Sequence, residues 1–302
     1  MLNNINNDYH WALGLIEADG YIGFNCQNPK SPSSVKKKYT FQVKVSLKNY
    51  NSRAVYRIKS IFSVGKIHKS SDGMITWKVS NTDILINKVF PIFDTYPFKG
   101  KKYFDLVATK EAIVLYKSDR TWQEKHEILS ILKESITCEL RNISPIWYPY
   151  LEPKDYLIDP EPILLAPAQY KNMVPSQEVL KTLISPSWLS GFIEGDGSFQ
   201  INNRLQAVFE LGQKYNIFLV FAIHKFFNVP SKVKFTTNLS YFSISSKHPR
   251  VLDEVEKTVE KKLLGIKSFE FAVWRRARRT VLVTKKEKAS LILNKIRLRL
   301  IK

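Results

Sequence analysis

The sequence predicts an α+β protein built as a pseudo-twofold tandem repeat of two αββαββα units. The first supporting observation is the motif WALGLIEADG at residues 11–20, which reappears as WLSGFIEGDG at residues 188–197, an offset of 177. The second is a series of matches at a constant offset of 165, running from Tyr50 and Tyr215 to Gly100 and Gly265. A gap-free register of this length indicates a duplicated chain. The difference between the two offsets, 12 residues, predicts an insertion in the first half, within the polar stretch 28–38.

Each half shows the same order of elements. A short apolar helix carries the motif, and two strands follow it, at residues 21–27 and 40–47 in the first half and at 198–202 and 206–211 in the second. Hydrophobic and polar residues alternate along 40–47, which is typical of a strand with one buried face. A helix is then expected at 52–62 and at 217–227. A hairpin turning at 71–73 or 237–238 follows, and helices close each half.

A proline-rich segment separates the two repeats. Residues 143–187 contain eight prolines, and proline at this density interrupts regular elements. We therefore expect an N-terminal repeat at 1–142, a linker at 143–187 and a C-terminal repeat with a basic tail at 188–302. Trp147, Tyr148 and Tyr150 in the linker predict that it is held against the surface rather than free.

The composition narrows the class of protein. Forty-seven Lys and Arg against 27 Asp and Glu give a net charge of +20, which makes a polyanion the expected partner. Two cysteines, Cys26 and Cys138, exclude a disulfide scaffold and a four-cysteine zinc site. The longest apolar run, residues 217–223, is too short to span a bilayer, so no membrane partner is expected. No targeting signal is legible at the N-terminus. Richness in Asn, Lys, Ile and Tyr indicates an AT-rich gene and, if the gene lies in an organelle, a mitochondrial or chloroplast location.

Small residues recur four positions apart in both motif helices: Gly14 and Ala18 in one, Gly191 and Gly195 in the other. Such residues share one helix face and let two helix backbones approach closely. The two motif helices are therefore expected to pack against each other across the pseudo-twofold axis.

This packing would bring Asp19 and Asp196 side by side at the C-terminal ends of the helices. A carboxylate there opposes the helix dipole, and two carboxylates repel each other. A bound divalent cation would make the two adjacent carboxylates favourable, because cations such as Mg²⁺ prefer hard oxygen atoms as ligands. One Asp-Gly pair would be more simply explained as a helix stop. Two copies in matched repeats of a basic chain favour a metal site.

The segments ALGLIEADG at 12–20 and LSGFIEGDG at 189–197 resemble the two motifs of the monomeric LAGLIDADG homing endonucleases. Glu replaces the frequent Asp at the sixth motif position in both copies, Leu13 and Ser190 stand at the usual Ala, and Ala12 stands at the usual first Leu. The resemblance implies a monomer that cleaves both strands of a long double-stranded DNA site. It also implies that Asp19 and Asp196 bind Mg²⁺ and are catalytic.

The resemblance extends to further catalytic residues. Lys102 and Lys267 occupy matched positions and resemble the family's catalytic lysine, although Lys101 is a close competitor in the first half. Gln213 resembles the polar residue at the end of the second strand that orients water. Its counterpart in the first half is Lys48 by the offset of 165, which predicts an asymmetric site.

The paired sheets are expected to form a saddle whose polar face reads DNA in the major groove, since Gln, Asn, Arg and Lys contact base edges there. A polar solvent face is also ordinary for an antiparallel sheet. Basic runs at 36–38 and 275–279, and the lysines beyond them, would attract phosphates without reading sequence. The predicted DNA-binding residues are Asn25, Gln27, Gln42, Lys44, Ser46, Lys66, His68 and Lys78 in the first half, and Gln200, Asn202, Arg204, Gln206, Lys232, Lys234 and Tyr241 in the second.

Three functions fit these observations. The first is a site-specific, intron-encoded endonuclease that promotes homing of its intron. The second is an RNA-binding maturase, which would make the host intron RNA a partner, and the third is a ribosome-associated RNA-binding protein that reuses the fold. Two intact aspartates favour the endonuclease, because a pure RNA binder has no need for both.

Overall fold

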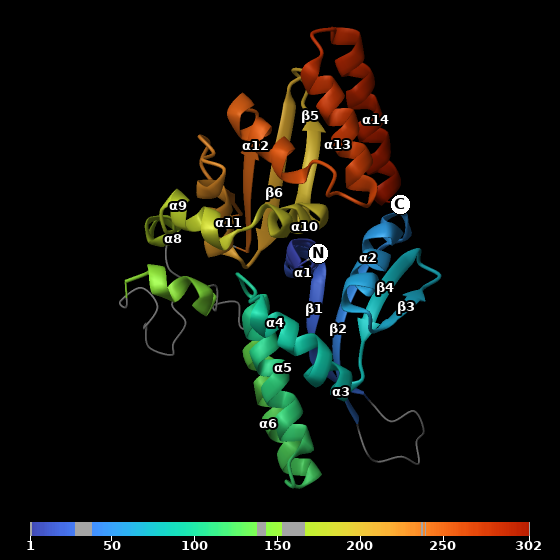
Figure 1. The fold of residues 1–302 in the computed structure, drawn as a ribbon, viewed down its shortest axis with the longest axis vertical. Helices are drawn as coiled ribbons and strands as arrows, with labels where there is room; N and C mark the ends of the chain where they lie inside the picture. The colour runs from blue at the N-terminus through green and yellow to red at the C-terminus, as the bar shows by residue number, and fades with distance from the viewer. Residues whose placement is uncertain are drawn as a thin grey trace.

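The computed structural model describes residues 2–27, 38–137, 143–152, 167–236, 238 and 240–301. It confirms the predicted α+β tandem repeat, with two four-stranded antiparallel sheets. Figure 1 shows the sheets extending in opposite directions from a central pair of helices, α1 and α10. These two helices are the ones that carry the repeated motif.

The first repeat has the predicted order of elements, with additional helices after the sheet. Its helix α2 begins and ends where the sequence predicted, and its hairpin turns between Lys69 and Met74 as expected. The elements are α1 (Leu2–Asp19), β1 (Gly20–Gln27), β2 (Lys38–Lys48), η1 (Asn49–Asn51), α2 (Ser52–Phe62), β3 (Lys66–Lys69), β4 (Met74–Val79), α3 (Thr82–Ile84), the π-helical turn η2 (Leu85–Val89), α4 (Phe90–Thr95), α5 (Lys102–Lys117) and α6 (Trp122–Thr137).

The second repeat follows the same plan. Its second strand is longer than predicted, and β7 has only two residues, so Lys232 precedes that strand instead of lying in it. The elements are α10 (Pro186–Asp196), β5 (Gly197–Ile201), β6 (Ala207–Lys214), α11 (Ile217–Phe226), β7 (Lys234–Phe235), β8 (Tyr241–Ser246), α12 (Pro249–Val259), α13 (Ile266–Arg279) and α14 (Val283–Ile301).

The two sheets have the same strand order, β1-β2-β4-β3 and β5-β6-β8-β7. Along β2 the hydrophobic residues are buried as the alternation predicted, and the fully buried Trp77 lies opposite Val45 on the neighbouring strand β4. In each repeat a long helix covers the apolar face of the first two strands: α5 in the first repeat and α13 in the second. The opposite face of each sheet carries the polar residues.

The segment between the repeats contains three short helices in its described parts: η3 (Pro145–Tyr150), α8 (Pro167–Met173) and α9 (Gln177–Leu183). Proline is the first residue of two of these helices, η3 and α8, where its missing N–H has no partner to lose. Trp147 is fully buried, donates to the carbonyl oxygen of Lys99 at 2.7 Å and packs on Phe218. The linker is thus anchored to both repeats. The predicted boundaries between the linker and the two repeats, at residues 142 and 187, stay a prediction.

Candidate active site and nucleic-acid interface

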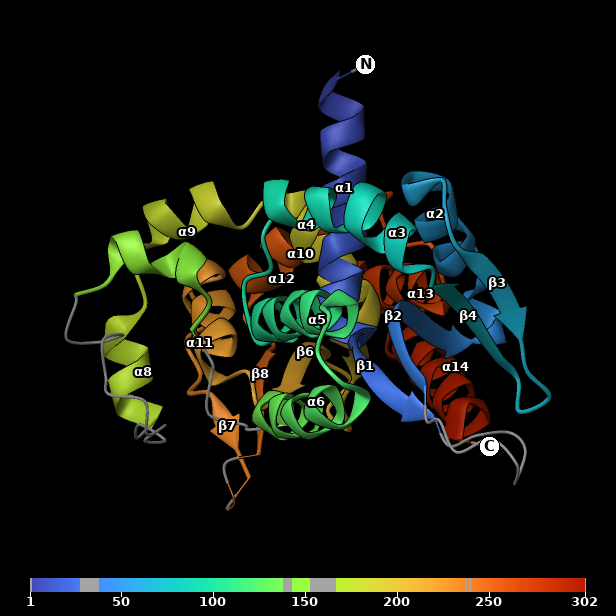
Figure 2. The ribbon, with the colours of Figure 1, turned by 90° about the horizontal axis from the view of Figure 1, so that it is seen from below.

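The motif helices cross at two glycines. A Cβ on Gly14 would lie 1.9 Å from the carbonyl oxygen of Trp188, and a Cβ on Gly191 would lie 1.9 Å from that of Trp11. No residue other than glycine allows this approach, and the two contacts are reciprocal. The expectation that small residues let the helices pack backbone to backbone is confirmed. Figure 2 shows α1 running from a protruding N-terminal end down to the level of the strands.

Asp19 and Asp196 are the last residues of α1 and α10. They lie together, since a Cβ on Gly195, the neighbour of Asp196, would be 3.0 Å from Oδ2 of Asp19. Asp19 keeps contact with solvent, although protein atoms surround most of its carboxyl group. The juxtaposition that the sequence predicted for these two carboxylates is therefore present in the fold.

The environment of the pair disfavours two negative charges. Burial and then repulsion from Asp19 raise the pKa of Asp196 to about 7. Burial also raises the pKa of Asp19. In both cases Lys267 and Lys102 oppose the rise, which places both lysines within electrostatic range of the aspartates. Two carboxylates held in this way need a positive partner in order to ionise together at neutral pH.

Both lysines stand at the start of a long helix beside the aspartates. Lys102 is the first residue of α5, and its Nζ lies 3.5 Å from Oδ2 of Asp105. Lys267 is the second residue of α13. The competing Lys101 instead places its Nζ 5.7 Å from the ring centroid of Tyr215 and is not among the groups acting on the aspartates. This geometry favours Lys102 over Lys101.

Two glutamates of the motif hold these helices in place, a role that the sequence reasoning missed. Oε2 of Glu17 accepts from the backbone N–H of Lys99 at 2.7 Å, just before α5. Glu194 accepts from the N–H groups of Leu264 and Gly265, at 2.6 and 3.0 Å, just before α13. Anions are favourable at helix N-termini. The available signal was a second acidic residue in the last turn of an apolar helix, in both copies.

Gln213 donates a hydrogen bond to Oδ2 of Asp196, as a residue that orients the site would. Strand pairing corrects its predicted counterpart in the first repeat. Gly20 pairs with Val45, and Gly197 pairs with Leu211, so the residue two positions farther along is Leu47 in β2 and Gln213 in β6. Leu47, and not Lys48, therefore occupies the place of Gln213.

This shift of one residue between sequence match and strand pairing has a local cause. The segment from Val45 to Tyr50 in the first repeat is one residue longer than the segment from Leu211 to Tyr215 in the second. The extra residue is taken up in the turn η1, whereas Tyr215 makes the shorter connection with a left-handed φ of 51°. The predicted asymmetry of the site is thus present but greater than expected. Asp196 has the amide of Gln213 beside it, whereas the buried Leu47 occupies the matching place in the repeat of Asp19.

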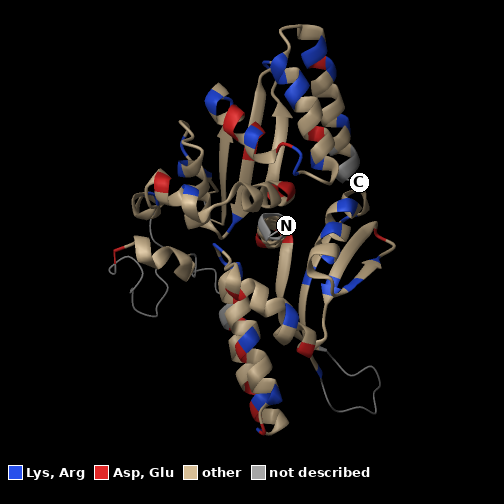
Figure 3. Ribbon diagram, in the orientation of Figure 1, with Lys and Arg blue, Asp and Glu red and all other residues tan. Residues whose placement is uncertain are grey.

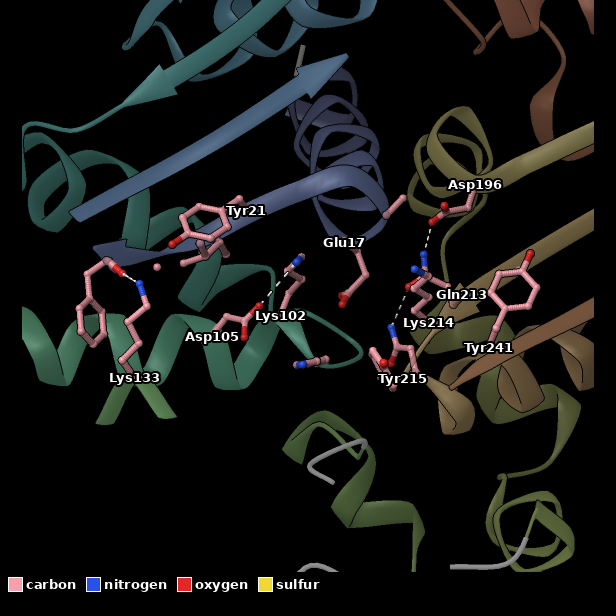
Figure 4. Close-up of a pocket in the computed structure, with 17 residues that line it drawn as sticks. Glu17, Tyr21, Lys102, Asp105, Lys133, Asp196, Gln213, Lys214, Tyr215 and Tyr241 are labelled. Atoms are coloured by element: carbon pink, nitrogen blue, oxygen red, sulfur yellow. Dashed lines mark hydrogen bonds and ion pairs between the residues drawn. The ribbon is translucent and has the colours of Figure 1, made fainter. Parts of the chain in front are cut away.

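A cavity of about 560 Å³ opens beside Asp196, between the two repeats. Figure 4 shows its labelled residues converging from several elements: Glu17 from α1, Lys102 and Asp105 from α5, and Asp196 with Gln213 from the second repeat. Tyr241 lies across from Gln213 on β8. The cavity thus combines carboxylate, ammonium, amide and phenol groups, which suits a charged substrate group.

On the first sheet, the predicted reading residues share one face. Cross-strand pairing aligns Lys44, Lys78 and Lys66 in a single row, with Ser46 and His68 in the next. Asn25 lies on the same face near the far end of β1, where Lys133 donates to its side chain. Gln42 is a correction, because it is only 7% exposed on that face, packed beside Tyr21. The side chain of Gln27 lies outside the described part of the chain, as do Lys36 and Lys37.

On the second sheet, Gln200, Lys234 and Tyr241 share the polar face. Asn202, Arg204 and Gln206 lie in and beside the exposed turn between β5 and β6, where Oδ1 of Asn202 accepts from the N–H groups of the other two. The exposed Lys232 lies in the loop before β7. One acid interrupts this face: Glu210 accepts hydrogen bonds from Gln200 and Ser245.

The predicted phosphate-binding run at 275–279 is largely paired within the protein, which corrects its assignment as a free cationic surface. Arg278 and Arg279 both bind Glu256 of α12, and Arg275 binds Glu260 at 3.2 Å. Figure 3 shows lysine and arginine recurring along α13 and α14. The exposed Lys285 and Lys288 of α14, and the partly exposed Lys286 between them, remain available for phosphates.

Within the described residues, no helix is both long enough and apolar enough to cross a membrane.

Comparison with known proteins identifies the family. The sequence model of the LAGLIDADG endonucleases matches residues 12–113 and 189–278. The chain is 28% identical over 279 residues to the probable intron-encoded endonuclease Cox1-I1b of Schizosaccharomyces pombe, covering 89% of this chain and 63% of that protein. The chain therefore spans less than two thirds of the length of that relative.

Two solved structures share the fold. The I-LtrWI LAGLIDADG homing endonuclease bound to target DNA superposes with a TM-score of 0.70 at 18% identity, covering 97% of this chain and 98% of that one. I-SmaMI bound to uncleaved DNA in the presence of calcium ions superposes with a TM-score of 0.65 at 18% identity, covering 96% of each chain. Taken with the family match over both repeats, these findings show that the chain belongs to the LAGLIDADG endonuclease family.

Proposed function

We propose that this protein is a site-specific DNA endonuclease that makes a Mg²⁺-dependent double-strand break in a long target. The observation that carries the proposal is the placement of Asp19 and Asp196 at the base of the crossed helices, with Lys102 and Lys267 acting on both. The matched relatives, an intron-encoded endonuclease and homing endonucleases bound to DNA, support it. One chain supplies both halves of the site, so a monomer suffices.

The donor set fits Mg²⁺. Among the described residues no cluster of three or more His, Cys, Asp or Glu could hold a metal alone. Mg²⁺ is commonly bound by only one or two carboxylates, with waters and substrate phosphates completing its coordination. Asp19 and Asp196 provide those carboxylates. Burial and then mutual repulsion raise the pKa of Asp196, and a cation held by the two carboxylates would offset both effects. The I-SmaMI complex with uncleaved DNA in the presence of calcium ions is in keeping with a divalent-ion requirement.

Each site residue has a role set by its chemistry. Bound Mg²⁺ supplies a water of lowered pKa and stabilises charge on the departing 3′ oxygen. Lys102 and Lys267 neutralise charge at the scissile phosphates, and Gln213 orients Asp196 and neighbouring water. Glu17 and Glu194 act indirectly, by holding the lysine-bearing helices against the motif helices.

The polar faces of the two sheets would read the target. The lysine row on the first sheet suits guanine edges and phosphates, while Gln200 and Glu210 on the second sheet offer an amide and a carboxylate to bases. Contacts of this kind distribute specificity over both half-sites. We further propose that the protein is intron-encoded, promotes homing of its intron and acts in the organelle that carries it, as the name of the Schizosaccharomyces pombe relative suggests.

The experiment first selects cleaved sequences from a randomised DNA library in Mg²⁺ and then places the winner in a supercoiled plasmid. The wild-type protein should linearise the plasmid in Mg²⁺ and leave it intact in EDTA. Asp19→Asn and Asp196→Asn should each abolish double-strand cutting while target binding, measured by gel shift in Ca²⁺, is retained. Full cutting by either variant would refute the metal assignment. Intron splicing assistance without any DNA cleavage would establish the maturase alternative instead.

A further inference from the structure

The repeat contains a matched pair of asparagines that the proposed chemistry does not use. Asn51 and Asn216 stand 165 positions apart, each directly before the helix that follows its DNA-facing strand. We propose that each is a positioning residue for the lysine-bearing helix of the opposite repeat, so that the two halves of the active site are assembled by exchanged contacts. This inference rests on the proposed endonuclease function.

Asn51 belongs to the first repeat but binds the second. Its Oδ1 accepts from the backbone N–H of Ile266 at 2.9 Å, in a partly buried contact. Ile266 is the first residue of α13 and immediately precedes Lys267. A Cβ on Gly265 would lie 2.4 Å from Oδ1 of Asn51, so a larger residue here would displace the asparagine side chain. The hydrogen bond therefore fixes the backbone from which the catalytic lysine extends.

With this contact, three hydrogen bonds hold consecutive backbone N–H groups at the start of α13. Glu194, from the repeat's own motif helix, accepts from Leu264 and Gly265, and Asn51 accepts from the next N–H along the chain. Free N–H groups are a general feature of helix N-termini and need acceptors when buried. Two of the three acceptor contacts come from one repeat, and the third comes from the other. Both repeats therefore determine the position of Lys267.

Asn216 makes the reciprocal approach. It is 3% exposed, lines the cavity beside Asp196 and presses against Gly100, whose Cβ would lie 2.3 Å from Oδ1 of Asn216. Gly100 lies two residues before Lys102. Nδ2 of Asn216 also reaches Oε1 of Gln213 at 3.5 Å, and Gln213 binds Asp196. Asn216 therefore connects the aspartate of its own repeat with the helix start of the other.

The two contacts are not equal. Oδ1 of Asn216 has no hydrogen-bond partner within the described residues, whereas Oδ1 of Asn51 is engaged. The α13 side is therefore the one that depends on a formed hydrogen bond. Substitution of Asn51 is therefore a more direct test of the proposal than substitution of Asn216.

The experiment measures the cleavage rate of each DNA strand separately, with the selected target labelled differently on its two strands and resolved on a denaturing gel. Lys267→Ala and Lys102→Ala define which strand each lysine serves. Asn51→Ala should slow the same strand as Lys267→Ala, by up to about 100-fold, because displacement of about 1 Å can cost that much. The control, Asn49→Ala, alters an exposed neighbour in the same turn and should leave the strand ratio unchanged.

The ratio of two rates within one sample does not depend on how much of the protein is folded, so a loss of stability cannot imitate the effect. A wild-type ratio for Asn51→Ala, or a bias towards the strand served by Lys102, would overturn the inference while the endonuclease function stands. If neither lysine variant distinguishes the strands, the lysine roles and the inference fall together. If no variant or wild-type protein cuts DNA, the proposed function itself is refuted.

Discussion

Lys99 is a buried cation whose replacement should stabilise the protein. It is 4% exposed, and burial lowers its pKa from 10.5 to about 8, against the attraction of Glu17. Its Nζ lies 5.4 Å from the ring centroid of Trp188. The second repeat has the partly buried Leu264 at the matched position, so leucine is the replacement that the repeat itself offers. The backbone hydrogen bonds of Lys99 to Glu17 and Trp147 do not depend on its side chain. We therefore expect Lys99→Leu to fold normally.

The magnitude follows from the pKa. A fall from 10.5 to about 8 corresponds to about 3 kcal/mol of destabilisation when the amine is charged, at about 1.4 kcal/mol for each tenfold change in proton affinity. Leucine removes that cost but loses a cation–π contact of about 1 to 2 kcal/mol. The net gain in the free energy of unfolding should be about 1 to 2 kcal/mol at pH 7.

The pH dependence has a defined sign. The pKa in the folded state is depressed, so the penalty is fully present below pH 8, shrinks as the pH rises and vanishes above 10.5. Urea unfolding of Lys99→Leu and wild type at pH 7 and pH 10 should show a stabilisation that is largest at pH 7. Lys59→Leu, at an exposed position of α2, is the control. A destabilised Lys99→Leu at pH 7, or a difference that does not change with pH, would refute the reasoning.

Three further outcomes are expected. Gly191→Ala and Gly14→Ala should each lower the free energy of unfolding by about 1 to 3 kcal/mol, because each new methyl group would meet a carbonyl oxygen at 1.9 Å; urea titration that found either variant as stable as wild type would contradict this. Leu47→Gln places an amide beside Asp19 as Gln213 stands beside Asp196, so the ratio of the two strand rates should move towards one in the labelled-strand assay. Target affinity should fall steeply with salt, with a log–log slope of about −0.9 for each phosphate neutralised, and a flat dependence would exclude the basic surface as a phosphate binder.

The symmetric parts of this fold could be predicted from the sequence because they are encoded locally. Gly14 and Gly191 lie at the helix crossing, and Asp19 and Asp196 lie at the helix ends, where spacing along a single helix determines which residues share a face. Strand alternation likewise identified the buried face of β2. In each case the controlling geometry is fixed within about ten residues, so the pattern is visible without the tertiary structure.

The remaining features depend on contacts between distant segments. Arg278 belongs to a basic run in the sequence, but its charge is balanced by acids of α12, more than twenty residues away. Gln42 alternates correctly with its polar neighbours yet is buried by the packing around Tyr21. Neither outcome is encoded in the local pattern, because both depend on which element packs alongside.

The position of Leu47 illustrates why two repeats in one chain differ from two identical subunits. In a symmetric dimer a residue beside one aspartate must also stand beside the other, so the pair Leu47 and Gln213 could not exist. The same holds for Lys99 and Leu264 at the glutamate-bound helix starts. Residues on the pseudo-twofold axis, such as the crossing glycines, remain matched because each contacts the other helix in the same way. A fused repeat can therefore keep the matched crossing glycines while Leu47 and Gln213, or Lys99 and Leu264, differ between its two halves.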